Sequence, residues 1–311
     1  MGVSVCMVNH NGEELVRKYL LKVVESLESE NGLVWELVFF DNGSSDNSVD
    51  VVRELCPSAQ VLCSRRNLGF SKSNNIAVRF TKYEKILFLN NDVVPEKGFL
   101  GPLLNRLDDE EVFAVAPKMY RPDKQLDDGI RNAEFRTGLF TPVLDLDRSM
   151  RNKADLTTFF CGGAVLLKKE LFYKLGGFDL IYNPYSWEDL DISYRAWKYG
   201  YQVVYEPSSV VYHLRETTAK KVYSQSYLKI IVWRNRFMFM WKNLSFSPGI
   251  LEHLFYLPSK LVKFICTGRG LYVVGFFWAL LRLPEVLIGR FKEQKNFIRT
   301  DNEVFKLAGE L

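Results

Sequence analysis

Residues 36–46 read Glu36-Leu37-Val38-Phe39-Phe40-Asp41-Asn42-Gly43-Ser44-Ser45-Asp46, an apolar run that ends abruptly in a polar loop. Residues 36–40 predict a buried strand, and residues 45–55 predict a helix that opens with capping residues. The same alternation continues on both sides. Further strands are expected at residues 3–8, 61–63 and 86–89, and further helices at residues 13–27 and 71–80. Strands that alternate with helices predict an α/β fold whose parallel sheet is covered on both faces.

Polar residues directly follow three of these strands. The segments are Asp41 to Asp46, then Arg66-Asn67-Leu68-Gly69-Phe70, then Asn90-Asn91-Asp92. Each segment alone is an ordinary turn or strand exit. In parallel sheets, however, ligands bind beyond the carboxyl ends of the strands, which meet at one edge. The coincidence of three polar strand ends therefore predicts a binding site at that edge.

A divalent cation is expected at this edge, because a bound nucleoside diphosphate would need charge balance and the loops offer few lysines. Asp92 is placed to hold such a cation, since Mg²⁺ prefers carboxylate oxygens and Mn²⁺ also accepts imidazole. His213, one of three histidines, is expected at the end of a later strand and could supply a second ligand. The alternative is an ordinary surface histidine.

Three acids, Glu188, Asp189 and Asp191, cluster at the expected start of a helix. One interpretation is helix capping by Ser186 with acids that complement the helix dipole. The other is a general base, because acidic neighbours raise the pKa of a carboxylate that must take a proton from a hydroxyl. In that interpretation Glu188 and Asp191 flank the base, Asp189.

Two further segments stand out before this helix. Gly162 and Gly163 interrupt an apolar strand pattern at residues 159–168, which indicates close approach of the backbone to a ligand. Residues 121–155 are polar and are expected to form a long loop or irregular insertion, which is usually functional when it lies inside a domain.

Taken in order, these residues resemble the family-2 glycosyltransferases of GT-A fold, with a Rossmann-like sheet. The closest likeness is to the bacterial rhamnosyltransferase-like and galactofuranosyltransferase-like branch. The matching pieces are Val8-Asn9-His10-Asn11-Gly12, the loop from Asp41 to Asp46, Asn67 to Phe70 with Asn75, Leu89 to Asp92, Gly162-Gly163-Ala164, Gly176-Gly177-Phe178-Asp179, Trp187-Glu188-Asp189-Leu190-Asp191, and His213. They span residues 3–218, and their common register makes the likeness specific.

The resemblance implies roles for individual residues. Asp189 would be the catalytic base, and Asp92 and His213 would hold Mn²⁺ or Mg²⁺. The residues implied to bind the nucleotide donor are Val8, Asn9, Asp41, Gly43, Asn67, Gly69, Asn75, Asn91 and Asp92. Those implied on the side of the acceptor and the donor sugar are Gly162, Gly163, Trp187 and Glu188. The sequence departs from the family at Asn90-Asn91-Asp92, which has one acid where the motif has two aspartates.

The mechanism implied by the resemblance is inversion at the anomeric carbon. Asp189 would deprotonate an acceptor hydroxyl, and the cation would stabilise the departing diphosphate. The expected donor is dTDP-rhamnose, with a UDP-linked galactofuranose or hexose as the alternative. The expected acceptor is a lipid-linked saccharide or polysaccharide in cell-surface glycan synthesis. Outside enzymes, the alternative is an inactive scaffold that binds sugar nucleotides.

Beyond residue 218 the composition changes. Residues 220–299 hold fourteen Lys and Arg but three acids, interleaved with large apolar residues. Basic amphipathic helices of this kind suit the surface of an anionic bilayer. We therefore expect a catalytic domain at residues 1–218 and a helical, membrane-associating extension at residues 219–311. A cap over the catalytic domain and a homodimer interface are the alternatives, while the apolar faces are too large for nucleic acid.

The cellular location is expected to be the cytoplasmic face of the plasma membrane. The five cysteines form no CxxC pair, which favours a reducing compartment. No signal peptide is expected at residues 1–12, and the longest apolar run, residues 271–281, is shorter than the ~20 residues that span a bilayer. Both observations favour peripheral attachment.

Overall fold

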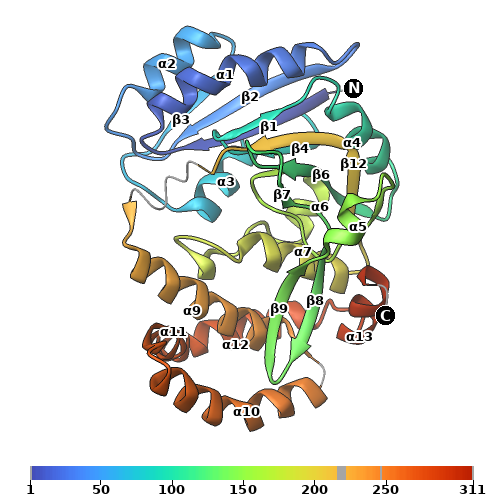
Figure 1. The fold of residues 1–311 in the computed structure, drawn as a ribbon. Coiled ribbons are helices and arrows are strands. Elements are labelled where there is room, and N and C mark those ends of the chain that lie inside the picture. The colour runs from blue at the N-terminus through green and yellow to red at the C-terminus, as the bar shows by residue number, and fades with distance from the viewer. Residues whose placement is uncertain (1, 216–221, 246, 310–311) are drawn as a thin grey trace.

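The computed structural model describes residues 2–215, 222–245 and 247–309. Their centre is a mixed sheet of ten strands (Figure 1). One half is parallel, in the order β3-β2-β1-β4, as the sequence predicts. These strands are β1 (Gly2–Asn9), β2 (Val34–Asp41), β3 (Gln60–Cys63) and β4 (Lys85–Leu89).

The other half of the sheet mixes directions. Strand β11 runs antiparallel to both of its neighbours, β4 and β6, while β12 runs parallel to β6. The strands of this half are β5 (Val93–Pro95), β6 (Val112–Tyr120), β7 (Leu126–Asp128), β10 (Asp155–Leu156), β11 (Ala164–Lys168) and β12 (Gln202–His213). Because β12 lies parallel to β6, its last residue, His213, arrives at the edge where β4 ends.

Helices cover both faces of the sheet. Alternate residues of a strand face opposite sides, and β1 shows this: Val5 and Met7 join one buried core, and Cys6 joins the other. The first core packs under α1 (Glu13–Glu28), α2 (Ser48–Leu55) and α4 (Leu100–Leu107). The second packs against α3 (Phe70–Val78), α6 (Lys169–Lys174) and α7 (Glu188–Lys198), with the short 3-10 helix η1 (Leu180–Tyr182).

The expectation that residues 121–155 form a long loop or irregular insertion is wrong. This segment holds β7, a hairpin of β8 (Arg131–Arg136) and β9 (Leu139–Leu144), and α5 (Leu146–Met150). The hairpin turns at Thr137 and Gly138, both with positive φ, and reaches toward α10 (Figure 1). The Gly138 N–H donates to Glu252 (3.0 Å), and its carbonyl accepts from His253 (2.6 Å). The hairpin could not be predicted from its own sequence, because it is stabilised by contacts with residues more than 100 positions later in the chain.

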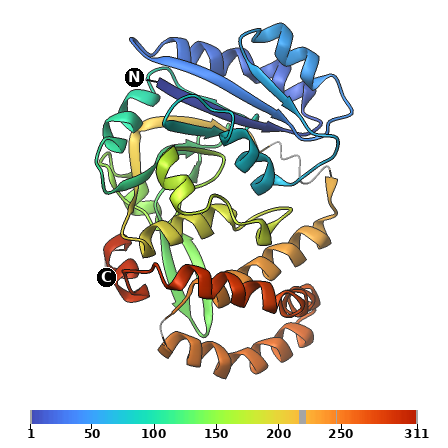
Figure 2. The ribbon, with the colours of Figure 1, turned by 180° about the vertical axis from the view of Figure 1, so that it is seen from behind.

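The C-terminal helices stack on the side of α7 that faces away from the sheet (Figures 1 and 2). They are α9 (Gln225–Asn243), α10 (Ser247–Cys266), α11 (Gly270–Leu281), α12 (Leu283–Gln294) and α13 (Asp301–Ala308). Four consecutive residues of α9, Phe237 to Met240, are buried in the same core as α7. The domain boundary at residue 218 stays a prediction.

In the part of the chain that the structure describes, no single helix has the length and apolar character to cross a membrane. The pair formed by α11 and α12, bent by 65° at the break between them, passes that test together.

Asp191 on α7 ties this helix to α9. Its fully buried carboxylate accepts hydrogen bonds from Arg195 (2.7 Å), Lys242 (2.9 Å) and Asn243 (2.7 Å). Burial alone would raise the pKa of Asp191, but the Arg195 and Lys242 cations hold that pKa well below its usual range. The expectation that Asp191 raises the pKa of Asp189 is therefore wrong, because its charge is paired within the core.

Replacing Asp191 with Asn is expected to destabilise the fold strongly, because Arg195 and Lys242 lose their buried counter-charge. Removing one partner of a buried ion pair costs about 3–5 kcal/mol, which lowers the thermal midpoint by several degrees. Calorimetry of D191N measures this. The control is D50N, whose ion pair with Arg53 is exposed and contributes little. Equal midpoints for the two variants would contradict the role given to Asp191.

Candidate active site

Two adjoining pockets form a cleft at the edge of the sheet where the parallel strands end. Phe70, Asn90 and Tyr185 line both of them. The strand-end pocket is also lined by Val8, Asn9, His10, Asn42, Asn67, Gly69, Asn91, Asp92, Pro184, Val222 and Tyr223. The acid pocket is also lined by Asp128, Arg131, Pro142, Phe160, Cys161, Gly162, Gly163, Ser186, Glu188, Asp189, Leu190, His213 and Arg215. The three polar strand ends thus meet as the sequence predicts.

Amide side chains join the loops of the strand-end pocket. Asn91 donates to Asn9 (2.7 Å) and so links the ends of β4 and β1. Asn42 donates to Asn67 (2.9 Å) and accepts from the backbone N–H of Leu68 (2.7 Å). An amide can donate and accept hydrogen bonds at once, so asparagine suits a place where the loops after neighbouring strands must hydrogen-bond to one another. The result is a preorganised rim around the pocket.

Glycines let these loops approach closely. Gly43 has a φ of 75°, and a Cβ there would lie 2.6 Å from the backbone of Arg66. Gly69 has a φ of 82°, and its Cβ would meet the Asn183 side chain at 2.9 Å. Both positions therefore exclude a side chain on grounds of conformation and space.

Four of the predicted residues line neither pocket: Asp41, Gly43, Asn75 and Trp187. The Asn75 amide binds the backbone N–H and carbonyl of Phe178 (3.0 and 2.8 Å), so it supports the turn at residues 176–179. Trp187 is buried against Phe239, with ring centroids 5.3 Å apart. Neighbouring groups thus hold both side chains, and their contact with a ligand stays a prediction. Asp41 is 4% exposed and accepts from the Ser44 N–H (3.0 Å), and its contact with a base stays a prediction.

Asp189 is held rigidly in the acid pocket. One carboxylate oxygen accepts from the backbone N–H of Gly162 (3.0 Å), and the other accepts from that of Leu190 (2.9 Å). Burial raises the pKa of Asp189, although these two N–H groups oppose the shift. The backbone of Gly162 thus contacts an acid, while its approach to a ligand stays a prediction.

Glu188 beside it is a different kind of acid. Its side chain is buried, and its Oε2 has no hydrogen-bond partner among the described residues. Burial, followed by the charge of Asp189, raises the pKa of Glu188 well above its ordinary value. Two neighbouring carboxyls in one low-dielectric site separate into a protonated and an ionised group. Here the larger upward shift of pKa falls on Glu188, because it is buried without a hydrogen-bond partner for Oε2, so Asp189 is the more readily ionised of the two.

The loop before these acids adopts a strained backbone. Ser186 and Trp187 both have positive φ, 70° and 79°, which is uncommon for residues other than glycine. Ser186 is therefore not the helix cap, and Trp187 occupies that position without a side-chain cap bond.

Helix α9 holds this strained loop from below. The Asn235 amide donates to the carbonyls of Tyr182 (2.9 Å), Tyr185 (2.9 Å) and Ser186 (2.7 Å). The neighbouring Arg234 donates to the Asn183 carbonyl (2.6 Å). Sequence reasoning missed Asn235, and its signal was a polar triplet, residues 234–236, flanked by the apolar residues 230–233 and 237–241.

Asp92 and His213 come together as predicted, with His213 Nε2 3.5 Å from Asp92 Oδ2. The other ring nitrogen, Nδ1, hydrogen-bonds to Asp127 at 2.9 Å. Burial alone would lower the pKa of His213, but hydrogen bonds to Asp127 and Asp92 raise it to about 9. Sequence reasoning missed Asp127 because it lies in the segment expected to be a loop.

Asp92 and His213 fit a divalent cation whose remaining coordination positions are filled by a bound phosphate compound. Histidine ligands of metals commonly donate their second N–H to a carboxylate, and Asp127 supplies that carboxylate. No group of three or more His, Cys, Asp or Glu suited to a metal occurs in residues 2–215, 222–245 and 247–309. Mg²⁺ in phosphate-binding sites is typically held by one or two carboxylates plus the phosphates. Asp92 and His213 would therefore hold the ion jointly with a diphosphate.

Arg131 and Arg215 bring positive charge to the acid pocket. Arg131 donates to Asp128 (2.9 Å), and Arg215 donates to Asp127 (2.8 Å). Burial alone would raise the pKa of Asp127, but hydrogen bonds from His213, Arg215 and Arg121 hold it well below its usual range. Asp127 is thus a fixed anion between His213 and Arg215.

Replacing Asp127 with Asn is expected to weaken Mn²⁺ binding in the presence of UDP by about 10-fold or more, the usual effect of losing a carboxylate behind a histidine ligand. Titration followed by electron paramagnetic resonance measures the free ion directly. The control is D123N, in the same segment but exposed. Unchanged affinity in D127N would show that Asp127 does not orient His213 for a metal.

Comparison with known proteins identifies the family. The family model described as "Glycosyl transferase family 2" matches residues 4–176, more than half of the chain. Polypeptide N-acetylgalactosaminyltransferase 4 of Caenorhabditis elegans is 26% identical over 68% of this chain and 38% of its own length. Pre-mycofactocin glycosyltransferase of Mycobacterium tuberculosis (strain CDC 1551 / Oshkosh) is 27% identical over 60% of this chain and 40% of its own. The chain spans less than half the length of these curated relatives.

Solved structures share the fold at low sequence identity. S. aureus TarS 1-349 superposes with a TM-score of 0.58 at 14% identity, covering 98% of this chain and 90% of its own. The mannosyltransferase PcManGT from Pyrobaculum calidifontis, in complex with GDP-Man and Mn²⁺, gives 0.55 at 17% identity over 94% and 86%. GalNAc-T7 with UDP, GalNAc and Mn²⁺ gives 0.59 at 16% identity over 77% and 47%. The predicted GT-A fold is confirmed, and the chain belongs to glycosyl transferase family 2.

Proposed function

We propose that the protein transfers a sugar from a nucleoside-diphosphate donor to an acceptor hydroxyl with inversion at the anomeric carbon. One observation carries this proposal. The acid pocket presents an ionisable carboxylate, Asp189, held by two backbone N–H groups, and it shares three wall residues with the pocket formed by the strand ends. A donor in the strand-end pocket would therefore place its sugar beside Asp189.

The proposed reaction is a single displacement. The acceptor oxygen gives its proton to Asp189 and bonds to the anomeric carbon, while the bond from that carbon to the diphosphate breaks on the opposite side. A carboxylate with a raised pKa suits this transfer, because in its ionised form it is a stronger base than an ordinary aspartate. Glu188, whose pKa is raised further, would in its protonated form donate a hydrogen bond to a sugar hydroxyl.

Positive charge for the leaving group would come from two sources. Arg131 and Arg215 line the acid pocket. A divalent cation held by Asp92 and His213 would, when bound, offset the charge that develops on the diphosphate. Two of the similar structures were solved with Mn²⁺, which supports this assignment.

The donor that we favour is a UDP-linked hexose or N-acetylhexosamine. One relative above is named as an N-acetylgalactosaminyltransferase, and two of the solved structures contain UDP with GalNAc or GDP-Man. These names support UDP-sugars over dTDP-rhamnose, which remains the second candidate. An inactive sugar-nucleotide-binding scaffold is the alternative outside enzymes.

We further propose that the acceptor is lipid-linked and that the protein works peripherally on the cytoplasmic face of the plasma membrane. Large apolar side chains exposed on α10, α11 and α12 support this location.

Hydrolysis of nucleotide sugars, with water in place of the acceptor, tests the proposal. Asp189→Asn is expected to lower the rate of UDP release by about 100-fold or more, because the amide cannot take a proton, while UDP still raises the thermal midpoint. Glu188→Gln is expected to lose far less, because the amide resembles the protonated carboxyl. If E188Q loses more activity than D189N, Glu188 is the base instead. Nucleotide binding without hydrolysis of any donor would favour the scaffold.

A further inference from the structure

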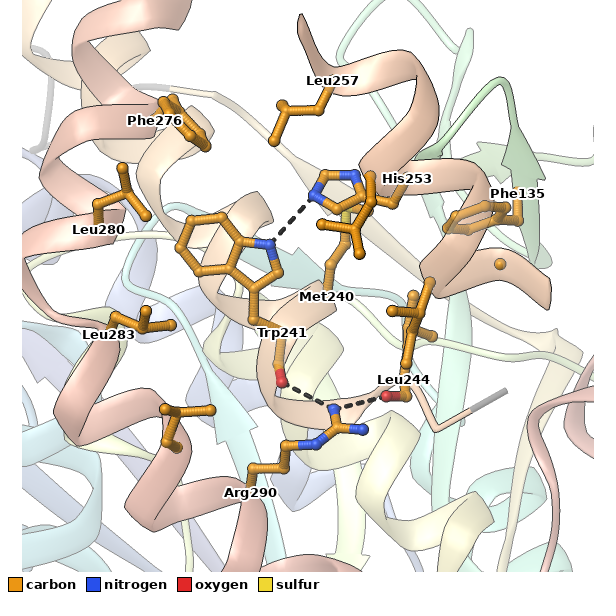
Figure 3. Close-up of a pocket in the computed structure, with 14 residues that line it drawn as sticks. Phe135, Met240, Trp241, Leu244, His253, Leu257, Phe276, Leu280, Leu283 and Arg290 are labelled. Carbon is orange, nitrogen blue, oxygen red and sulfur yellow. Dashed lines mark hydrogen bonds between the residues drawn. The ribbon is translucent and has the colours of Figure 1, made fainter. Parts of the chain in front are cut away.

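A cavity of about 440 Å³ lies between the C-terminal helices, away from the cleft (Figure 3). Its walls come from α9, α10, α11 and α12, with Phe135 of the β8–β9 hairpin. Apolar side chains form nearly all of the lining, among them Met240, Leu244, Leu257, Phe276, Leu283 and Leu287. None of these residues belongs to the proposed catalytic site.

The polar groups in the cavity wall satisfy one another. The Trp241 indole N–H donates to His253 Nε2 (3.1 Å; Figure 3). On the other side of the ring, His253 Nδ1 hydrogen-bonds to the Gly138 carbonyl (2.6 Å). Burial lowers the pKa of His253, so the neutral ring can make both bonds. Arg290 donates to the carbonyls of Trp241 (2.8 Å) and Leu244 (2.6 Å). A cavity whose polar groups are already paired holds water poorly and accepts apolar molecules.

The cavity opens toward an exposed apolar surface. Three of its lining residues, Leu254, Leu280 and Leu287, are 60%, 37% and 39% exposed. Further large apolar side chains are exposed on the same helices: Leu251, Phe255, Val262, Ile265, Phe277, Leu281, Ile288 and Phe291. Isolated apolar residues are normal on a surface, but a concentration of this kind marks an interaction site.

Charge indicates which partner covers this surface. Lys263, Arg269, Lys292 and Lys295 are exposed on or beside these helices. The three acids of the same region each accept a hydrogen bond from within the protein. Their donors are the Gly138 N–H to Glu252, Arg282 to Glu285, and the Tyr199 hydroxyl to Glu293. A second copy of this chain would oppose one basic surface to another, which is unfavourable. An anionic bilayer matches both the charge and the apolar side chains.

We propose that helices α10 to α12 rest on an anionic bilayer and that the cavity takes up one hydrocarbon chain of a bilayer lipid. The exposed leucines at its mouth would lie among the acyl chains, so a chain could enter without crossing water. The inference rests on the membrane location proposed above but not on sugar transfer, so an empty cavity and an inactive catalytic site are separate failures.

Photo-crosslinking in vesicles tests the cavity. The full chain is mixed with phosphatidylcholine–phosphatidylglycerol vesicles that contain a lipid with a diazirine near the end of one acyl chain, and the adducts are mapped by mass spectrometry. Adducts are expected on Met240 and Leu244, inside the cavity. The cavity-filling variants Leu287→Trp and, on another wall, Leu280→Trp should remove these adducts while UDP-sugar hydrolysis persists. Leu21→Trp, at an exposed position on α1, is the matched control.

The same vesicles test the surface. The double variant K263E/K292E is expected to weaken binding by about tenfold or more, since each basic residue near an anionic membrane contributes about 1 kcal/mol. K22E/K97E, at exposed positions on the sheet side, is the control.

Two results would overturn the proposal. Adducts on exposed residues such as Phe255 and Phe277, with none on Met240 or Leu244, would show membrane contact with an empty cavity. Absence of vesicle binding, together with a concentration-dependent dimer in light scattering, would show that a second copy covers the surface.

Discussion

The buried charges around Asp191 are the constraint on which the rest of the structure depends. Asp191 lies two residues after Asp189 on the first turn of α7, and it is fixed from below by Arg195 of the same helix and Lys242 of α9. A buried carboxylate is tolerated only when cations and hydrogen bonds compensate its desolvation. The turn that presents the acids to the cleft therefore has one position relative to α9. Through Asn235, α9 also holds the strained loop that precedes Glu188.

This anchoring joins the C-terminal helices to the chemistry of the cleft. On one side, α9 contacts the loop that precedes Glu188 and Asp189. On its other side, α9 forms a wall of the apolar cavity. The two proposed ligands, a sugar nucleotide and a lipid chain, would thus occupy opposite sides of one structural unit. If both proposals hold, the arrangement suits an enzyme whose acceptor is carried by a membrane, because α9 fixes Asp189 relative to the proposed bilayer surface.

Much of the lining of the cleft could be predicted from the sequence, but the residues that hold this lining in position from behind could not. Alternating strands and helices placed the three polar strand ends at one edge, and Asp92 meets His213 there as the family resemblance implies. The hairpin of β8 and β9, Asp127 and Asn235 escaped prediction because their partners lie far away in the chain. Asp191 was misassigned for the same reason: an acidic cluster does not reveal which member turns inward to meet a lysine that lies 51 residues later.

The most direct test of the central claim is the configuration of the first sugar released by hydrolysis. Proton magnetic resonance can follow a hydrolysed UDP-sugar before the free sugar mutarotates, with water acting as the acceptor. A single displacement assisted by Asp189 predicts that the sugar appears first with the anomeric configuration opposite to that of the donor. First appearance of the retained configuration would contradict the account, because one base acting on one attacking oxygen cannot produce it.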